Sequence, residues 1–288
     1  MIRTGIDISN TYHKSYAIVS NYEGFDINEE KWQLTLGRKF VTDLLSIIKK
    51  FPDSQVMFAF DSTDNFRKVI SKEYKANRTR KEQAFYDLLD EIYEILKGKG
   101  YNTVKINGLE ADDILALYHE NAYLDDFTVL VSNDEDIRQL VDENTVVFTA
   151  NTSNYKLYCD SIKTVAKNAP NFISEAHVVN PLIIFFKKLL LGCDGDNVKR
   201  ILPKGQGPAK VEKICDYITK NDAQLDDALS HFGYDITNEE LMKQTKLVCL
   251  GSSFMPTEYS YKYLEQTLNN IPVETDMKIL LTGTRFIS

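Results

Sequence analysis

Acidic side chains recur in this chain just after short apolar segments, a placement that could bring them together. Aspartate lies within or directly after the segments TGIDI and VMFAF, and the groups GLEADD, SNDED and GCDGDN hold further acids. The four histidines and four cysteines are scattered, without the spacing of a zinc site. An all-oxygen ligand set selects hard ions, so we expect two Mg²⁺ ions, for which Mn²⁺ would substitute. The candidate metal ligands are Asp7, Asp61, Glu110, Asp112, Asp113, Asp134, Asp136, Asp194 and Asp196.

Each acidic group alone has an ordinary structural explanation. Acids in the first turn of a helix interact favourably with the helix dipole, and a stretch such as SNDED is usual at a helix N-cap. An isolated aspartate after a strand is usual in a turn. Five groups at equivalent places nevertheless favour one shared site, because so many carboxylates would repel each other unless cations compensated them. Two divalent ions about 4 Å apart suit phosphoryl-transfer chemistry.

These acids converge only if the strands before them run parallel, and the order of the elements predicts that they do. Strands are expected at 4–8, 56–60, 102–106, 127–132 and 145–150, and helices at 34–51, 82–97, 110–122 and 134–140. This alternation is typical of an α/β fold with a mainly parallel, doubly wound sheet. Ligands of such sheets bind at the carboxyl ends of the strands, where the acids lie.

The pattern changes to helices after Asn180-Pro181, with helices expected at 181–191, 208–220 and 238–250. We therefore predict an α/β core over 1–180 and a helical subdomain over 181–288. A strand at 278–283 is also expected, without a place in the sheet. The N-terminus has no apolar stretch of a secretory signal and no apolar run could span a bilayer, so we expect a cytoplasmic protein with no membrane partner.

Basic side chains are concentrated in two segments, although the net charge is −8. Residues 65–81 hold seven basic side chains against one acid, and residues 197–213 hold five against one. The first segment follows Asp61 and could hold a phosphate backbone beside the metals. In the second, Gly205 and Gly207 precede a helix, where backbone N–H groups can bind a phosphate or the loop carbonyls a cation such as K⁺. A solvated charged face is the alternative for both segments.

The order of these motifs resembles the 5′ nuclease family of flap endonucleases and 5′–3′ exonucleases, over residues 4–220. The layout is most similar to phage 5′ exonucleases and phage RNase H, and the family includes the exonuclease domain of bacterial DNA polymerase I. The motifs that carry the resemblance are GIDISN, FAFDSTDNFR, EYKANR, GLEADDILA, SNDEDIRQL, GCDGDN and GQGPAKVEKI. Cys193 stands where many members have an acid, and Gln206 and Ala209 stand where an aliphatic residue and a lysine are frequent.

The resemblance implies a PIN-like, 5′-nuclease-like core, a basic arch within 62–100 and a helix–two-turn–helix that binds duplex DNA. It implies that Asp7, Asp61, Glu110 and Asp112 hold one ion, and that Asp134, Asp136 and Asp194 hold the second. Lys75 and Arg78 would act as catalytic residues on the scissile phosphate. The nucleic-acid contacts it implies are Arg67, Lys72, Arg80, Lys81, Lys199, Arg200, Lys204, Gly205, Gly207 and Lys210.

We therefore expect a Mg²⁺-dependent, structure-specific 5′ nuclease that acts in DNA replication or repair and leaves a 5′-phosphate and a 3′-hydroxyl. We expect the protein to be a monomer. Branched or flapped DNA is the expected substrate, and an RNA–DNA hybrid a further one. A sliding clamp or a single-strand-binding protein is a plausible partner. The layout without a polymerase suggests a phage enzyme, acting in the host cytoplasm. Two alternatives remain open, a PIN-type ribonuclease and a non-catalytic protein that binds DNA junctions.

Overall fold

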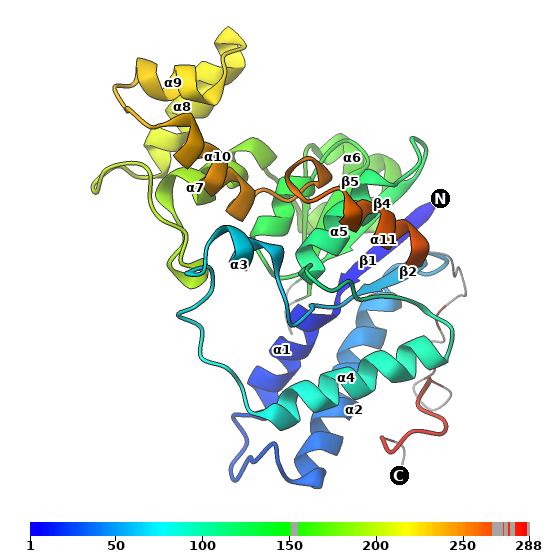
Figure 1. The fold of residues 1–288 in the computed structure, drawn as a ribbon. Coiled ribbons are helices and arrows are strands. Elements are labelled where there is room, and N and C mark those ends of the chain that lie inside the picture. Colours follow the sequence, from blue (N-terminus) through cyan, green and yellow to red (C-terminus); the bar gives the residue numbers. More distant parts are fainter. Residues whose placement is uncertain (151–154, 267–272, 274–275, 277–279, 287–288) are drawn as a thin grey trace.

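A seven-stranded sheet forms the centre of the molecule in the computed structural model, which describes residues 1–150, 155–266, 273, 276 and 280–286 (Figure 1). Its strand order is β3-β2-β1-β4-β5-β6-β7. The strands are β1 (Ile2–Asp7), β2 (Gln55–Ala59), β3 (Asn102–Val104), β4 (Phe127–Val131), β5 (Thr145–Ala150), β6 (Tyr155–Cys159) and β7 (Ala176–Val178).

The first five strands of the sheet run parallel, which confirms the predicted fold class. Strand β1 pairs with β2 and β4, β2 pairs with β3, and β4 pairs with β5, all in parallel. Strand β6 is antiparallel to β5, and β7 is parallel to β6. Because β1, β2 and β4 are parallel neighbours, the residues that follow them emerge at one edge.

Both faces of the sheet are buried under helices. Val56 and Phe58 of β2 pack into one apolar cluster, and Met57 and Ala59, which alternate with them, pack into another. The first cluster includes side chains of α1 (Ile8–Val19), α2 (Glu30–Ile48), α4 (Gln83–Gly98) and α6 (Ile162–Asn168), with η2 (Pro170–Glu175) beside it. The second includes side chains of α5 (Ala111–Glu120), η1 (Asp136–Leu140) and α11 (Glu258–Gln266).

A helical region after the sheet has its own apolar cluster. Its elements are α7 (Pro181–Leu191), η3 (Asp194–Asp196), α8 (Pro208–Asn221), α9 (Leu225–His231) and α10 (Asn238–Val248), followed by η4 (Ser252–Phe254). The chain then returns to the sheet, where Met255 and Tyr263 join the cluster around α5, and Phe286 joins the cluster on the other face. We therefore propose a narrower helical subdomain, 181–248, than the predicted 181–288.

The predicted arch begins with a short helix and continues as a long loop. Helix α3 (Phe66–Ile70) leads into residues 71–82, which contain no helix or strand and join α4 (Figure 1). In the figure this loop passes to one side of α1 and joins the N-terminal end of α4. We call residues 66–82 the arch, after the predicted segment; along the chain, Lys75 lies nearer α3 and Lys81 lies next to α4.

Several observed elements differ from the predicted ones. The segment expected as a helix at 134–140 forms a 3₁₀ turn, and helix α1 and strands β6 and β7 were not predicted. The strand expected at 278–283 lies partly outside the described residues; Leu280 is helical and residues 281–283 form a turn rather than a strand. Within the described residues, no helix is both long and apolar enough to cross a membrane.

Candidate metal centre and its basic surroundings

Two of the predicted ligands, Asp7 and Asp61, lie where β1 and β2 end, at one edge of the sheet. Asp7 ends β1 and caps α1, accepting hydrogen bonds from the Asn10 amide (2.8 Å) and the Ser132 hydroxyl (3.0 Å). The amide of Asp61 donates to the Ser9 hydroxyl (2.9 Å), and its Oδ1 accepts from the Ala111 amide (2.8 Å). These bonds connect the edge of the sheet to the first turn of α5.

The start of α5 adds three acids with different surroundings. Glu110 is the N-cap residue and forms a capping box with Asp113, whose Oδ2 accepts from the Glu110 amide (3.1 Å). Asp112 lies between them in sequence and is half-buried. Helix α5 is held against the sheet by apolar side chains such as Leu115. A rigid element therefore presents Glu110 and Asp112 to the acids of the strand ends.

Mutual repulsion indicates that five acids lie close together at this edge of the sheet. Burial, followed by the charge of Asp61, raises the pKa of Asp7 to about 8. Burial and the charges of Asp134 and Asp7 raise the pKa of Asp112 well above its usual range. Loss of hydration caused by the surrounding protein atoms, followed by the charge of Glu110, raises the pKa of Asp61, although the residue is partly accessible at the surface. Such an excess of carboxylate oxygens fits hard divalent cations.

A second acidic group lies between η1 and the turn after α7. Asp136 and Asp196 both bind the ammonium of Lys188 in α7, with 2.5 Å between Nζ and Oδ2 of Asp196. Burial and Asp134 act to raise the pKa of Asp136, opposed by Lys188, and the net shift is upward. Asp196 is 4 % exposed, whereas Asp194 of the same motif is exposed. Sequence reasoning assigned Asp194 to the second ion, and the structure places Asp196 beside the other acids instead.

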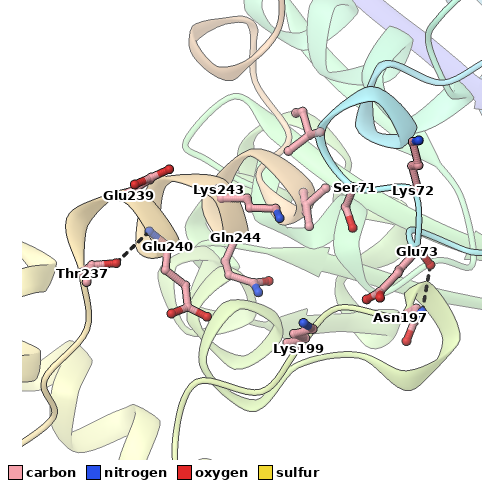
Figure 2. A pocket seen from close by; sticks show the side chains of 12 residues that line it. Ser71, Lys72, Glu73, Asn197, Lys199, Thr237, Glu239, Glu240, Lys243 and Gln244 are labelled. Carbon is pink, nitrogen blue, oxygen red and sulfur yellow. Dashed lines mark hydrogen bonds between the residues drawn. The ribbon is translucent and has the colours of Figure 1, made fainter.

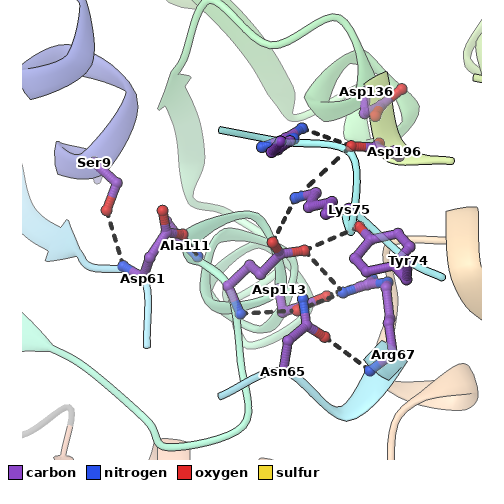
Figure 3. Close-up of polar contacts among 12 residues, drawn as sticks. Ser9, Asp61, Asn65, Arg67, Tyr74, Lys75, Ala111, Asp113, Asp136 and Asp196 are labelled. Atoms are coloured by element: carbon purple, nitrogen blue, oxygen red, sulfur yellow. Dashed lines mark hydrogen bonds and ion pairs between the residues drawn. The ribbon is translucent and has the colours of Figure 1, made fainter. Parts of the chain in front are cut away.

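Two cations from the arch reach these acids, as Figure 3 shows for Lys75. The Lys75 ammonium binds Glu110 Oε1 and lies 3.9 Å from Asp196 Oδ1. Arg78 Nη2 donates to the same Asp196 oxygen over 2.6 Å. Burial acts to raise the pKa of Glu110, but Lys75 and Arg67 hold it below its usual value. Lys75 and Arg78 thus lie beside the candidate metal ligands Glu110 and Asp196.

The described residues contain no complete set of metal ligands in place for an ion. No three acidic, histidine or cysteine side chains there form a ready ligand set for one ion. Lysine side chains instead bind several of the acids, as Lys75 binds Glu110 and Lys188 binds Asp136. Divalent ions would therefore have to exchange with these ammonium groups.

The predictions for Arg67 and Asp113 need correction. Arg67 is 1 % exposed, and its guanidinium donates to both oxygens of Asp113, each over 2.7 Å (Figure 3). It also donates to the carbonyls of Leu247 (3.1 Å) and Cys249 (3.2 Å) at the end of α10. Arg67 is therefore enclosed and bound to four protein oxygens, which does not fit a contact with a DNA phosphate. Both Asp113 oxygens are bound by Arg67, which does not fit a metal ligand. Their pairing connects the arch, α5 and α10.

Several predicted nucleic-acid contacts lie on the accessible surface. Lys72 and Lys199 line a cavity of about 470 Å³ between the start of the arch and α10 (Figure 2). Lys243 and Gln244 of α10 line it too, as do Glu73, Glu239 and Glu240. Arg80, Lys81 and Lys204 are exposed.

The loop before α8 keeps its glycines open to solvent. Gly205 has a φ of 93°, and Gly207 is the N-cap residue of α8; a side chain at either position would meet no atom within 4 Å. Arg200 donates to the carbonyls of Leu202 (2.7 Å) and Gln206, so its role includes bracing this loop. The Lys210 ammonium lies 4.0 Å from the ring centre of Phe232. The loop is thus accessible, with cations around it.

Comparison with known proteins identifies relatives of the same architecture. The chain is 28 % identical over 198 residues to a 5′-3′ exonuclease of Buchnera aphidicola subsp. Schizaphis graminum, an alignment that covers 67 % of this chain and 63 % of that one. It is 27 % identical over 220 residues to the 5′-3′ exonuclease of Mycoplasmopsis pulmonis, covering 73 % and 68 %. The alignment therefore spans slightly less than two thirds of the Buchnera protein.

A solved structure and a family model agree with these matches. The fold superposes on T5 5′-exonuclease with a TM-score of 0.62 at 18 % identity, covering 93 % of this chain and 100 % of that one. The model of the 5′-3′ exonuclease, N-terminal resolvase-like domain, matches residues 4–169 and includes the carboxylates from Asp7 to Asp136. Since this match spans more than half of the chain, the protein belongs to the 5′-3′ exonuclease family.

Proposed function

We propose that the protein is a structure-specific 5′ nuclease that hydrolyses phosphodiesters of DNA. The observation that carries this proposal is the meeting of acids from separate segments beside two cations of the arch. Asp7, Asp112 and Asp134 interact electrostatically at the sheet edge, and Lys75 contacts Glu110 beside them. The names of the relatives support the same activity.

The acids fit divalent ions, and we propose Mg²⁺ with Mn²⁺ as a substitute. One structure of T5 5′-exonuclease has divalent zinc ions bound, and the T5 D15 protein was co-crystallised with metal ions, which supports a metal requirement. The first position would be held by Asp7, Asp61, Glu110 and Asp112. The second would be held by Asp134, Asp136 and Asp196, with Asp196 in place of the predicted Asp194 because of its burial. Divalent ions in such a site activate water and neutralise charge on the phosphate.

The arch cations would act on the substrate phosphate. Lys75 and Arg78 now bind Glu110 and Asp196, and a phosphate entering the pocket would compete with these carboxylates for both cations. Fixed positive groups that contact the developing charge on the phosphate lower the barrier to hydrolysis. The products would be a 5′-phosphate and a 3′-hydroxyl.

The surrounding basic residues would position the DNA. Arg80 and Lys81 at the end of the arch next to α4 would contact the 5′ single strand, and Lys72 and Lys199 the backbone near the cut. The open glycine loop at 205–207 would take a duplex phosphate, or K⁺ through its carbonyls. A structure of T5 D15 flap endonuclease with DNA and metal ions supports branched DNA as the substrate class. Such contacts are independent of sequence and weaken with salt.

A cleavage assay on matched substrates tests the proposal. A labelled 5′-flap duplex and an all-RNA counterpart are incubated with Mg²⁺ or with EDTA. We expect cleavage of the DNA flap in Mg²⁺ only, its loss in Asp134→Asn with binding retained, and normal cleavage in Glu135→Gln, an exposed neighbour that pairs with Arg138. DNA binding without cleavage would instead support a junction-binding protein, and preference for RNA would support a PIN-type ribonuclease.

A further inference from the structure

Lys188 lies between two acids that belong to the proposed second metal position. Its Nζ donates to Oδ2 of Asp136 and, over 2.5 Å, to Oδ2 of Asp196. Asp136 begins η1, which follows β4, and Asp196 ends η3, which follows α7. The ammonium therefore joins two carboxylates from separate parts of the chain that would otherwise repel each other.

The burial of Lys188 requires this pairing. Only 10 % of its side chain is exposed, and it projects from a helix whose residues Ile184, Leu189 and Leu190 pack in the apolar interior. An ammonium in such surroundings is stable only when anions bind it closely. The alternative explanation, a lysine that merely extends along a helix to reach water, does not fit a side chain enclosed by two carboxylates.

A divalent ion would need the same oxygens. Asp196 is bound on both sides, through Oδ2 by Lys188 and through Oδ1 by Arg78 (2.6 Å). An ion that takes Oδ2 of Asp136 or of Asp196 must displace the ammonium or share the oxygen with it. Either course costs binding free energy, because like charges repel strongly where water is excluded.

We infer that Lys188 is a positioning residue for the second metal position, an internal counter-ion that holds Asp136 and Asp196 together and competes with a divalent ion for their oxygens. This inference rests on the proposed function. Lys188 thereby limits the affinity of the second position, and metal entry there requires its ammonium to move. The first position does not depend on Lys188, since Asp7, Asp61 and Asp112 make no contact with it among the interactions described above.

Mn²⁺ titration of the purified full chain, followed by calorimetry and by electron paramagnetic resonance, tests the competition without any cleavage reaction. Three proteins are compared: wild type, Lys188→Met and Lys187→Met. We expect Lys188→Met to bind its weaker Mn²⁺ about tenfold more tightly than wild type, because a contacting positive charge is removed. Lys187→Met removes the same charge from the preceding residue of α7. The ion pairs to Asp136 and Asp196 from α7 come from Lys188, so Lys187→Met should give a clearly smaller change.

Two further results complete the test. Lys188→Gln removes the charge but keeps a hydrogen-bond donor, so it should also bind the weaker Mn²⁺ more tightly, and it serves if Lys188→Met fails to fold. Unchanged or weaker Mn²⁺ binding in a folded Lys188 variant would overturn the inference, since it would show that Lys188 only supports the site. Wild-type protein that binds no Mn²⁺ would instead refute the metal-dependent nuclease proposal itself.

Discussion

The guanidinium of Arg67 donates to both carboxylate oxygens of Asp113, each over 2.7 Å, and both side chains are enclosed by protein. Arg67 belongs to α3 at the start of the arch, and Asp113 to the first turn of α5, which carries two proposed ligands. The same guanidinium binds carbonyls at the end of α10. One ion pair therefore fixes the arch, the ligand helix and the helical region relative to each other.

Removal of Arg67 should chiefly lower stability. Arg67→Ala leaves the Asp113 carboxylate buried without its partner, so we expect the free energy of unfolding in urea to fall by about 3–5 kcal/mol. Lys68→Ala, which removes an exposed cation of the same helix, should change it little. A stable Arg67→Ala protein with weakened DNA binding would support the original prediction of a phosphate contact.

Asp196 and Asp194 should differ sharply in cleavage, although they are two residues apart. Asp196→Asn removes a buried charge beside Lys188 and Arg78, and we expect the cleavage rate on a 5′-flap duplex to fall more than about 100-fold. Asp194→Asn changes an exposed side chain and should leave the rate close to wild type. The reverse ranking, measured at saturating Mg²⁺, would restore Asp194 as the ligand.

The fold and most of the site were predictable because they depend on local pattern. Apolar runs such as 127–132 and acids directly after them identify parallel strands with candidate ligands at one edge, and Asp7, Asp61, Asp112 and Asp134 lie there. Strands β6 and β7 were missed because β6 is half-exposed and β7 is only three residues long. Their pairing depends on the finished sheet rather than on local sequence.

Burial decided the remaining residues, and burial is a property of the tertiary structure. Arg67 looks like the other cations of its basic segment, and only the meeting with Asp113, 46 residues later, removes it from the surface. Lys188 interrupts an apolar helix, a signal that could have identified it as a buried cation needing acids. The choice between Asp194 and Asp196 had no local signal, since both follow α7.

Stability without divalent ions should fall as the pH rises. The pKa of Asp7 is raised from 3.8 to about 8 in the folded protein, so the folded state keeps a proton that the unfolded state has released. Its contribution to stability is complete below pH 3.8 and is lost as the pH passes 8, at up to about 1.4 kcal/mol per pH unit for one proton. Urea unfolding in EDTA between pH 5 and pH 9 should show this decline.

Two comparisons assign the decline to the acidic pocket. Asp7→Asn cannot titrate and should flatten the pH dependence, whereas Asp194→Asn should leave it as in wild type. Added Mg²⁺ should raise the melting temperature more at pH 8 than at pH 6, because ligand protons must leave when the ion binds. An equal slope in wild type and Asp7→Asn would show that other groups control the dependence.

Gly108→Ala should destabilise the protein more than an ordinary glycine substitution. Gly108 has a φ of 97°, its carbonyl accepts from the Phe66 amide (2.9 Å), and a Cβ there would collide with the phenol of Tyr259. Gly24 has a φ of 73° with no atom within 4 Å of an added Cβ, so Gly24→Ala should lose only the backbone contribution of about 1–2 kcal/mol. The clash should cost Gly108→Ala about 1–3 kcal/mol more in urea unfolding. Tyr259→Ala in the Gly108→Ala background should restore part of the lost stability. Equal losses in Gly108→Ala and Gly24→Ala would contradict a steric clash between an added Cβ at residue 108 and Tyr259.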